Sequence, residues 1–246
     1  MRGTFLNHNH GFDKGRISVI IPTINEIDNI EKPLKSLRSG DAWEVIVADG
    51  GSNDGTVTLA KSLGAKVVKS SPPKSRQMNQ GAARATGDVL LFLHADTRLP
   101  DKFDEHIFGC LRRPGVAAGA FKLRIESHIS ALRIIEHLAN WRSRRLKTPY
   151  GDQAIFISSR LFHQIGGFPS IPIMEDFELV RRLRKMGAIV TLPVSVSTSD
   201  RRWKNFGILK TTLINQMIIA AHFIGIPSDL IAKWYRRKKG TQLSDL

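Results

Sequence analysis

The chain has 246 residues, of which 41% are hydrophobic and 24% charged, a composition typical of a soluble globular protein. Its single cysteine, Cys110, excludes a disulfide framework and a cysteine-rich metal site, and fits a reducing cytoplasm. The formal net charge of +15 suggests an anionic partner such as nucleic acid, anionic lipid or a phosphorylated small molecule. Only 7% of residues are aromatic, and they are not interleaved with the basic ones as in a base-stacking surface. We therefore expect no nucleic-acid partner.

Neither end of the chain carries an obvious targeting or membrane segment. Residues 1–13 are polar and rich in His and Asn, so we expect no signal peptide there. The best candidate for a membrane span, residues 211–228, is interrupted by Asn215, Gln216, Gly225 and Pro227. It is marginal against the roughly 20 apolar residues that a span needs, so we interpret it as a core or interfacial helix. These features predict a cytoplasmic protein.

Strand-like and helix-like segments alternate along the first hundred residues. We predict strands at residues 17–21, 44–48, 66–68 and 88–93, and helices at residues 28–38, 54–63 and 75–85. This alternation is typical of βαβ units in a mostly parallel sheet with helices on both faces.

The alternation is looser beyond Pro100. We predict a helix to residue 112, a strand at 116–125, a basic helix at 128–146, a strand at 154–157, a helix at 176–186, a strand at 188–192, and two helices within 205–239 divided at Gly225-Ile226-Pro227. The sequence shows no repeat, no low-complexity linker and no second hydrophobic core, so we expect one domain over residues 1–246.

A glycine-rich turn after the second predicted strand is the most informative segment. The strand ends in Asp49, the turn contains Gly50, Gly51 and Gly55, and a helix follows. Loops at the carboxyl ends of strands are where open α/β sheets present ligand-binding groups. Asp54 can cap the next helix, which leaves Asp49 without an evident local duty. A carboxylate there suits the N–H groups of a base or the hydroxyls of a ribose.

Three further polar segments lie at or beyond strand ends. The segment Pro22-Thr23-Ile24-Asn25-Glu26 follows the first strand, and by itself it also fits a turn with a helix cap. His94 and Asp96 follow the most apolar strand, and in extended chain they would point the same way as ligands for Mg²⁺ or Mn²⁺. A hydrogen-bonded structural histidine is the alternative for His94. Glu175 and Asp176 begin a helix, where they are either capping carboxylates or include a general base.

Together these motifs, which run from Pro22 to Trp203, resemble the inverting glycosyltransferases of family 2. The resemblance implies an α/β fold of the GT-A (nucleotide-diphospho-sugar transferase) type, with a C-terminal helical tail. It also implies metal-dependent transfer of a sugar from a nucleotide-diphosphate donor, with UDP-sugars favoured, to a hydroxyl acceptor. The cofactor would be Mn²⁺ or Mg²⁺. Within the family the motif set looks closest to a small soluble bacterial subgroup named for arsenosugar biosynthesis.

The resemblance also implies roles for individual residues. Asp176 would be the catalytic base, with Glu175 beside it, and Asp96 with His94 would hold the metal. The nucleotide would contact Pro22, Thr23, Asn25, Glu26, Asp49, Gly51, Arg76, Asn79 and Asp96. The acceptor side would comprise Gly151, Asp152, Gln153, Arg202 and Trp203. The corresponding parts of the domain are a nucleotide-binding half at 15–100, an acceptor and catalytic half at 101–204, and C-terminal amphipathic helices at 205–246.

The sequence departs from the family pattern at two motifs. The first position of the DxD metal motif is His94, which leaves the ligand set open. The QxxRW motif of processive members keeps Arg202 and Trp203 but lacks its glutamine, which favours transfer of a single sugar.

Two other functions remain open, a non-catalytic nucleotide-binding relative and a sugar-nucleotidyltransferase. The second would normally have a glycine-rich loop after the first strand, and residues 22–26 contain no glycine. The C-terminal helices combine apolar segments with the basic residues 236–239. This pattern fits peripheral contact with the inner face of an anionic membrane, or simple packing of the helices on the core.

Overall fold

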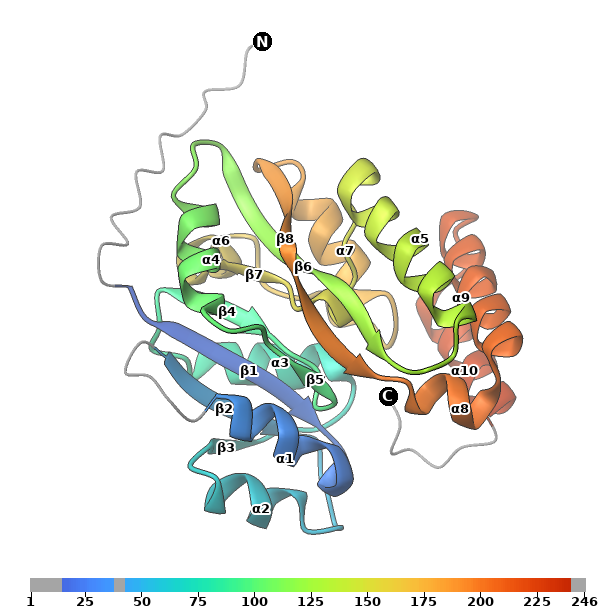
Figure 1. Cartoon of the computed structure of the whole chain (residues 1–246), viewed down its shortest axis with the longest axis horizontal. Helices are drawn as coiled ribbons and strands as arrows, with labels where there is room; N and C mark the ends of the chain where they lie inside the picture. Colours follow the sequence, from blue (N-terminus) through green and yellow to red (C-terminus); the bar gives the residue numbers. More distant parts are fainter. Residues whose placement is uncertain (1–14, 38–42, 240–246) are drawn as a thin grey trace.

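The computed structural model describes residues 15–37 and 43–239. Three predictions fall on other residues and lie outside this range: the lack of a signal peptide at 1–13, the end of the first helix at Arg38, and the last residues of the tail, 240–246. The described residues form a curled eight-stranded sheet with helices around it (Figure 1). Within these ranges no helix has both the length and the apolar character needed to cross a bilayer.

The first half of the sheet is parallel, as the alternation of strands and helices predicts. The strand order is β3-β2-β1-β4-β7-β6-β8-β5, and β1 pairs with both β2 and β4 in parallel. The carboxyl ends of β1, β2 and β4 therefore meet at one edge of the sheet. The elements of this half are β1 (Ile17–Thr23), α1 (Ile27–Ser36), β2 (Trp43–Asp49), α2 (Thr56–Ser62), β3 (Lys66–Lys69), α3 (Lys74–Ala83) and β4 (Val89–Phe92).

The second half is mixed. Strand β7 runs antiparallel to both β4 and β6, β5 runs antiparallel to β8, and only β6 and β8 are parallel. The elements of this half are β5 (Thr97–Arg98), α4 (Phe103–Leu111), β6 (Val116–Glu126), α5 (Ala131–Leu146), the 3₁₀ turn η1 (Gly151–Gln153), β7 (Phe156–Ser158), α6 (Ser159–Gln164), α7 (Glu175–Leu183) and β8 (Ala188–Ser199).

Alternate residues of β1 are buried in two different hydrophobic layers. Ile17, Val19 and Ile21 pack in the layer that includes α1 and α4, whereas Ile20 packs in the layer that includes α3 and α7. This follows from the two-residue period of a strand that is covered on both faces. Each fully buried isoleucine contributes roughly 1.5–3 kcal/mol, so β1 fixes the position of the loop that follows it.

Strand β8 is seven residues longer at its carboxyl end than the predicted strand 188–192. Pro193, which follows the predicted strand, cannot donate a hydrogen bond to a sheet ladder. In the structure the pairing of β6 with β8 shifts between Ala120 and Lys122, whose partners are Thr191 and Ser195. Pro193 therefore lies in an irregularity of the ladder, and the strand continues beyond it.

Three helices follow β8 in the described residues: the two predicted within 205–239 and a short one that begins earlier, at Arg201. These are α8 (Arg201–Phe206), α9 (Ile208–Phe223) and α10 (Ser228–Lys239), which gather beside α5 at one end of the molecule (Figure 1). The break before Pro227 is as predicted. The additional break falls at Gly207, which has a φ of 78° that a glycine adopts readily.

Candidate active site

A cleft of about 700 Å³ lies beyond the carboxyl ends of β1 and β4. Its walls come from the loops after these strands, from the start of α7, and from α5, α8 and α9. A cleft of this size suits a nucleotide-sugar-sized ligand. The predicted site residues that line it are Pro22, Thr23, Glu26, His94, Asp96, Asp152, Glu175, Asp176, Arg202 and Trp203.

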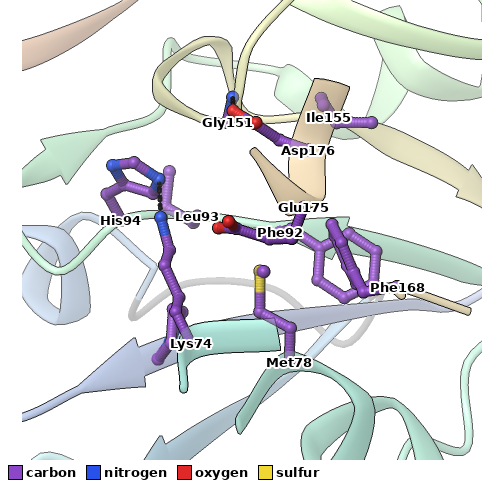
Figure 2. Close-up of a pocket in the computed structure, with 11 residues that line it drawn as sticks. Lys74, Met78, Phe92, Leu93, His94, Gly151, Ile155, Phe168, Glu175 and Asp176 are labelled. Atoms are coloured by element: carbon purple, nitrogen blue, oxygen red, sulfur yellow. Dashed lines mark hydrogen bonds between the residues drawn. The ribbon is translucent and has the colours of Figure 1, made fainter. Parts of the chain in front are cut away.

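Glu175 and Asp176 lie at the first turn of α7, where they line both the cleft and a small pocket that shares residues with it, which Figure 2 shows. Met174 precedes them with a φ of 65°, a left-handed conformation that is uncommon for a side chain of this size. Asp176 accepts hydrogen bonds from the backbone N–H of Gly151 (2.6 Å) and of Phe177 (2.7 Å). The Asp176 carboxylate is thus oriented by a backbone N–H of η1, which lies 25 positions earlier in the sequence.

The two adjacent carboxyl groups have different environments. Burial, followed by the charge of Asp176, raises the pKa of Glu175 to about 7. The Glu175 carboxyl group points toward the Lys74 ammonium group (Figure 2), which partly opposes this effect. Two neighbouring carboxyl groups whose surroundings differ in this way can serve as acid and base in one site.

Lys74 is a functional candidate that the sequence alone did not indicate. Its Nζ donates a hydrogen bond to Nε2 of His94 at 2.5 Å (Figure 2). Burial, Lys74 and Arg202 hold the pKa of His94 well below its usual value, so the neutral imidazole is the acceptor. Lys74 is the first residue of α3, and from sequence alone a lysine at a helix start is expected to be exposed. Its contact with His94 depends on the fold.

His94 and Asp96 are not in extended chain, which corrects one premise of the metal prediction. The Thr97 N–H donates to the His94 carbonyl at 3.1 Å, so the chain turns here. The hydroxyl groups of Thr97 and Thr198 donate to Oδ1 of Asp96. Among the described residues we find no protein donor to Oδ2, and no three His, Cys, Asp or Glu side chains that cluster as a metal site.

A divalent ion nevertheless fits at Asp96. Mg²⁺ in particular is commonly bound by one or two carboxylates together with substrate phosphates and water. Asp96 lines the cleft, and the two threonine hydroxyl groups engage only its Oδ1. Nε2 of His94 is engaged by Lys74, so this structure does not support that nitrogen as a ligand.

Asp49 has a structural role in the glycine turn that the sequence did not indicate. Its side chain is buried and accepts hydrogen bonds from the N–H groups of Gly51 and Ser52, both at 2.9 Å, and from the hydroxyls of Thr23 and Ser52. The carboxylate therefore holds the glycine turn in place. It does not line the cleft.

The loop after β1 is tied to this turn and to α8. The Asn25 N–H donates to the hydroxyl of Ser52, and the Asn25 side chain accepts from the N–H of Asn53. Glu26 forms an ion pair with Arg201 at 3.1 Å, although the two residues are 175 positions apart. Burial raises the pKa of Glu26. The pair connects the loop after β1 to the C-terminal helices.

Besides Asn25 and Asp49, three more predicted nucleotide contacts are not among the residues that line the cleft. Arg76 is exposed and bonds to the Ser71 hydroxyl. Asn79 forms two hydrogen bonds with the backbone of Phe168, of 2.8 and 3.0 Å, so it secures the loop before α7. Gly51 is exposed, and a Cβ there would meet no atom within 4 Å.

Gln77 is a buried residue of the same helix that sequence reasoning did not single out. Its Nε2 donates to the carbonyls of Thr23 (2.7 Å) and Ala48 (3.0 Å). It thereby joins the ends of β1 and β2 beneath the cleft. The mainly polar sequence of α3, KSRQMNQGAA, contains no signal that marks this glutamine out.

The predicted acceptor residues divide into two groups. Gln153 is buried and donates to the Phe121 carbonyl at 3.0 Å, which is a structural role, and Gly151 acts through its backbone N–H. Arg202 donates to Asn215 and to the Tyr235 hydroxyl, and Trp203 packs partly buried beside α5. Asp152 lines the cleft itself.

The sequence matches the family described as Glycosyl transferase family 2 over residues 18–167. It is 28% identical over 206 residues to an uncharacterized glycosyltransferase of Mycobacterium tuberculosis, covering 73% of this chain and 71% of that one. It is also 33% identical over 97 residues to glucosyl-3-phosphoglycerate synthase of Mycolicibacterium smegmatis, covering 35% of this chain and 32% of the synthase.

Solved structures share the fold. Glucosyl-3-phosphoglycerate synthase from M. tuberculosis, in complex with Mn²⁺, UDP and glucosyl-3-phosphoglycerate, matches with a TM-score of 0.60 at 22% identity, covering 87% of this chain and 82% of that chain. A mannosyltransferase from Pyrobaculum calidifontis, in complex with GDP-Man and Mn²⁺, matches with a TM-score of 0.60 at 22% identity. This second match covers 76% of our chain but only 56% of the mannosyltransferase. The architecture is thus that of GT-A glycosyltransferases, and the chain belongs to glycosyl transferase family 2.

Proposed function

We propose that the protein transfers one sugar, with inversion, from a nucleotide-diphosphate sugar to a hydroxyl acceptor. The observation that carries the proposal is a single cleft that holds Asp176, oriented by the Gly151 N–H, together with Asp96 at the end of β4. Asp176 would accept the proton of the acceptor hydroxyl as it attacks the sugar on the face opposite the diphosphate. Such an arrangement of base and leaving group produces inversion, through a transition state resembling that of glycoside hydrolysis.

Positive charge at the other side of the cleft would serve the leaving group. Asp96 would hold a divalent ion, which when bound neutralises the diphosphate. The Mn²⁺ complexes of two relatives with this fold support such an ion. Lys74 and Arg201 line the same cleft, and their cationic groups suit phosphate oxygens.

The donor is expected to be a UDP-sugar, with a GDP-sugar as the alternative. Complexes of fold relatives with UDP and with GDP-Man support these two classes. The motif set also supports a place in the subgroup named for arsenosugar biosynthesis. A non-catalytic nucleotide-binding relative would not need the oriented Asp176 carboxylate, which makes it the weaker candidate.

We also propose that the protein works in the cytoplasm, in peripheral contact with anionic membrane. The end of α5 exposes Arg144, Arg145 and Lys147 beside Leu146, and α10 exposes Arg236 and Arg237. Basic residues next to exposed apolar ones are typical of peripheral contact with anionic lipid. Flotation with vesicles that contain or lack anionic lipid tests this contact.

A donor-hydrolysis screen tests the enzymatic proposal. Purified protein is incubated with Mn²⁺ or Mg²⁺ and a panel of UDP-, GDP- and dTDP-sugars, and nucleotide release is measured. We expect release from one donor, abolished by chelation. Asp176→Asn should lose transfer by roughly 10²-fold or more while still binding the nucleotide, because only the general base is removed. The exposed Asp101→Asn serves as the matched control. Substantial transfer by Asp176→Asn would exclude Asp176 as the base.

A further inference from the structure

The cleft continues from the catalytic carboxylates into an apolar section between two helices. From α5 its wall includes Ile135, Leu138 and Trp141, and from α9 it includes Ile218 and Ile219. The nucleotide side of the same cleft is lined instead by charged and polar groups, such as Glu26 and Asp96. The two ends of one cleft therefore offer surfaces of opposite character.

The apolar section opens onto exposed apolar surface. Leu138 is 59% exposed and Trp141 is 52% exposed, although both line the cleft, and Ile134 one turn earlier is 64% exposed. Residues 134, 138 and 141 follow the i, i+4, i+7 spacing and so lie on one face of α5. The opposite side of α5 packs on β6 through Leu132. The exposed face has no protein partner among the described elements.

Helix α9 forms the other wall, which is mixed in character. It presents Ile218 and Ile219 to the cleft together with Thr212, Asn215 and Gln216. Ile218 also packs against Met174 and Phe177, which fixes this wall beside the start of α7. Apolar surface that continues from a binding cleft is the expected mark of a ligand with an apolar part.

Two buried polar atoms near the catalytic pair also lack a partner. Nη2 of Arg142 and Oδ1 of Asp152 are inaccessible to solvent and form no hydrogen bond in the structure. Both residues line the cleft, and the Arg142 guanidinium group lies 3.4 Å from the centre of the Tyr150 ring. Buried polar groups are normally satisfied, so these two point to a ligand that supplies a donor and an acceptor. A hydroxylated group supplies both.

We propose that the acceptor is amphiphilic, with a hydroxylated head bound at Arg142 and Asp152 and one apolar chain lying between α5 and α9. The polar head suits the polar part of the cleft and the chain suits its apolar part. The head would then lie beside Asp176, whose carboxylate is oriented by the Gly151 N–H of η1. This inference names the acceptor class for the transfer proposed above, and it rests on that proposed function. The chain would leave the cleft over Leu138 and Trp141.

Matched glucosides test the proposal without the need for turnover. Binding of n-octyl β-glucoside, below its micelle concentration, is compared by calorimetry with binding of methyl β-glucoside, which has the same head. We expect at least tenfold tighter binding of the octyl compound, since burial of about two methylene groups suffices for that ratio. Equal affinities, or no binding of either compound, would overturn the proposal.

Variants assign the two parts of the site. The double variant Leu138→Gln with Trp141→Gln should bring the octyl-to-methyl ratio close to one, whereas Asp152→Asn should weaken both glucosides equally. Met186→Gln is the matched control, because Met186 is an apolar residue, 42% exposed, outside the cleft. An unchanged ratio in the double variant, or an equal loss in the control, would contradict the assignment. Nucleotide titration of the same samples reports on the donor side, so failure of the proposed transfer and failure of the acceptor assignment are distinguishable.

Discussion

Replacing Glu175 with glutamine should make the protein more stable at neutral and alkaline pH. Burial and the neighbouring Asp176 raise the pKa of Glu175 to about 7, against 4.5 for an unperturbed glutamate. The native state therefore keeps a proton that the unfolded chain releases above pH 4.5. Because the native state binds more protons in this range, the free energy of unfolding falls as pH rises from about 4.5 to about 7.

The size of this effect follows from the two pKa values. Their difference corresponds to about 3 kcal/mol, and this is an upper figure because the native site relaxes around a buried charge. Below pH 4.5 the neutral glutamic acid and glutamine are nearly equivalent, so Glu175→Gln should have close to the native stability there. Above pH 8 it should exceed the native protein by up to about 3 kcal/mol.

Urea unfolding followed by tryptophan fluorescence measures this difference at pH 4.5, 6, 7 and 8. Glu105→Gln is the matched control, since the Glu105 side chain is 66% exposed and lies in the first turn of another helix. Its difference from the native protein should stay constant across the series. Parallel pH curves for the native protein and Glu175→Gln would refute the inference that Glu175 is protonated in the folded state below pH 7.

Three other predictions concern the donor side and the sheet. Lys74→Met should weaken binding of a nucleotide diphosphate by about tenfold, the value of one charge-assisted bond, and should raise the pKa of His94 in an NMR titration. Gln77→Met should lower the free energy of unfolding by roughly 1–3 kcal/mol, measured in urea, because two buried hydrogen bonds to strand-end carbonyls are lost, although the Thr23 carbonyl keeps the Gly50 N–H as a donor. Gly119→Ala should cost about 1–3 kcal/mol, since a methyl group there overlaps the Phe156 ring, whereas Gly109→Ala within α4 should gain roughly 0.5–1 kcal/mol. A destabilised Gly109→Ala, or a neutral Gly119→Ala, would contradict this account of the packing.

The parallel half of the sheet could be predicted from sequence because its signals are local. Strand β4 is a short, continuously apolar run, as expected of a strand buried on both faces. The short strand β5 and the break at Gly207 could not be predicted in the same way. Strand β5 has only two residues, and it exists because Thr97 pairs with Thr198 on a strand about one hundred residues later.

The sequence predicted which residues line the cleft best for motif residues that directly follow a strand or begin a helix. It predicted them less well where a polar side chain forms hydrogen bonds that hold a loop in place. Asp96 and Asp176 reach the cleft as expected. Asp49 and Asn79 have the same polar chemistry, but they satisfy backbone groups of nearby loops. Residue type cannot separate these roles, since the partner of Asn79 lies 89 positions away. Lys74 was missed for the same reason, because its partner is defined only by the packing of α3 on the sheet.

The bonds between α3 and the loop before α7 have a mechanical consequence. Asn79 holds Phe168 by two hydrogen bonds, and Ser75, one turn earlier, donates to the Ile171 carbonyl at 3.1 Å. The segment that leads to Asp176, the proposed general base, is thus held by hydrogen bonds against α3. We expect the two to move as one block, with any gate for incoming substrate provided by the outer helices. The geometry of the chemical step would then stay the same whether that gate is open or shut.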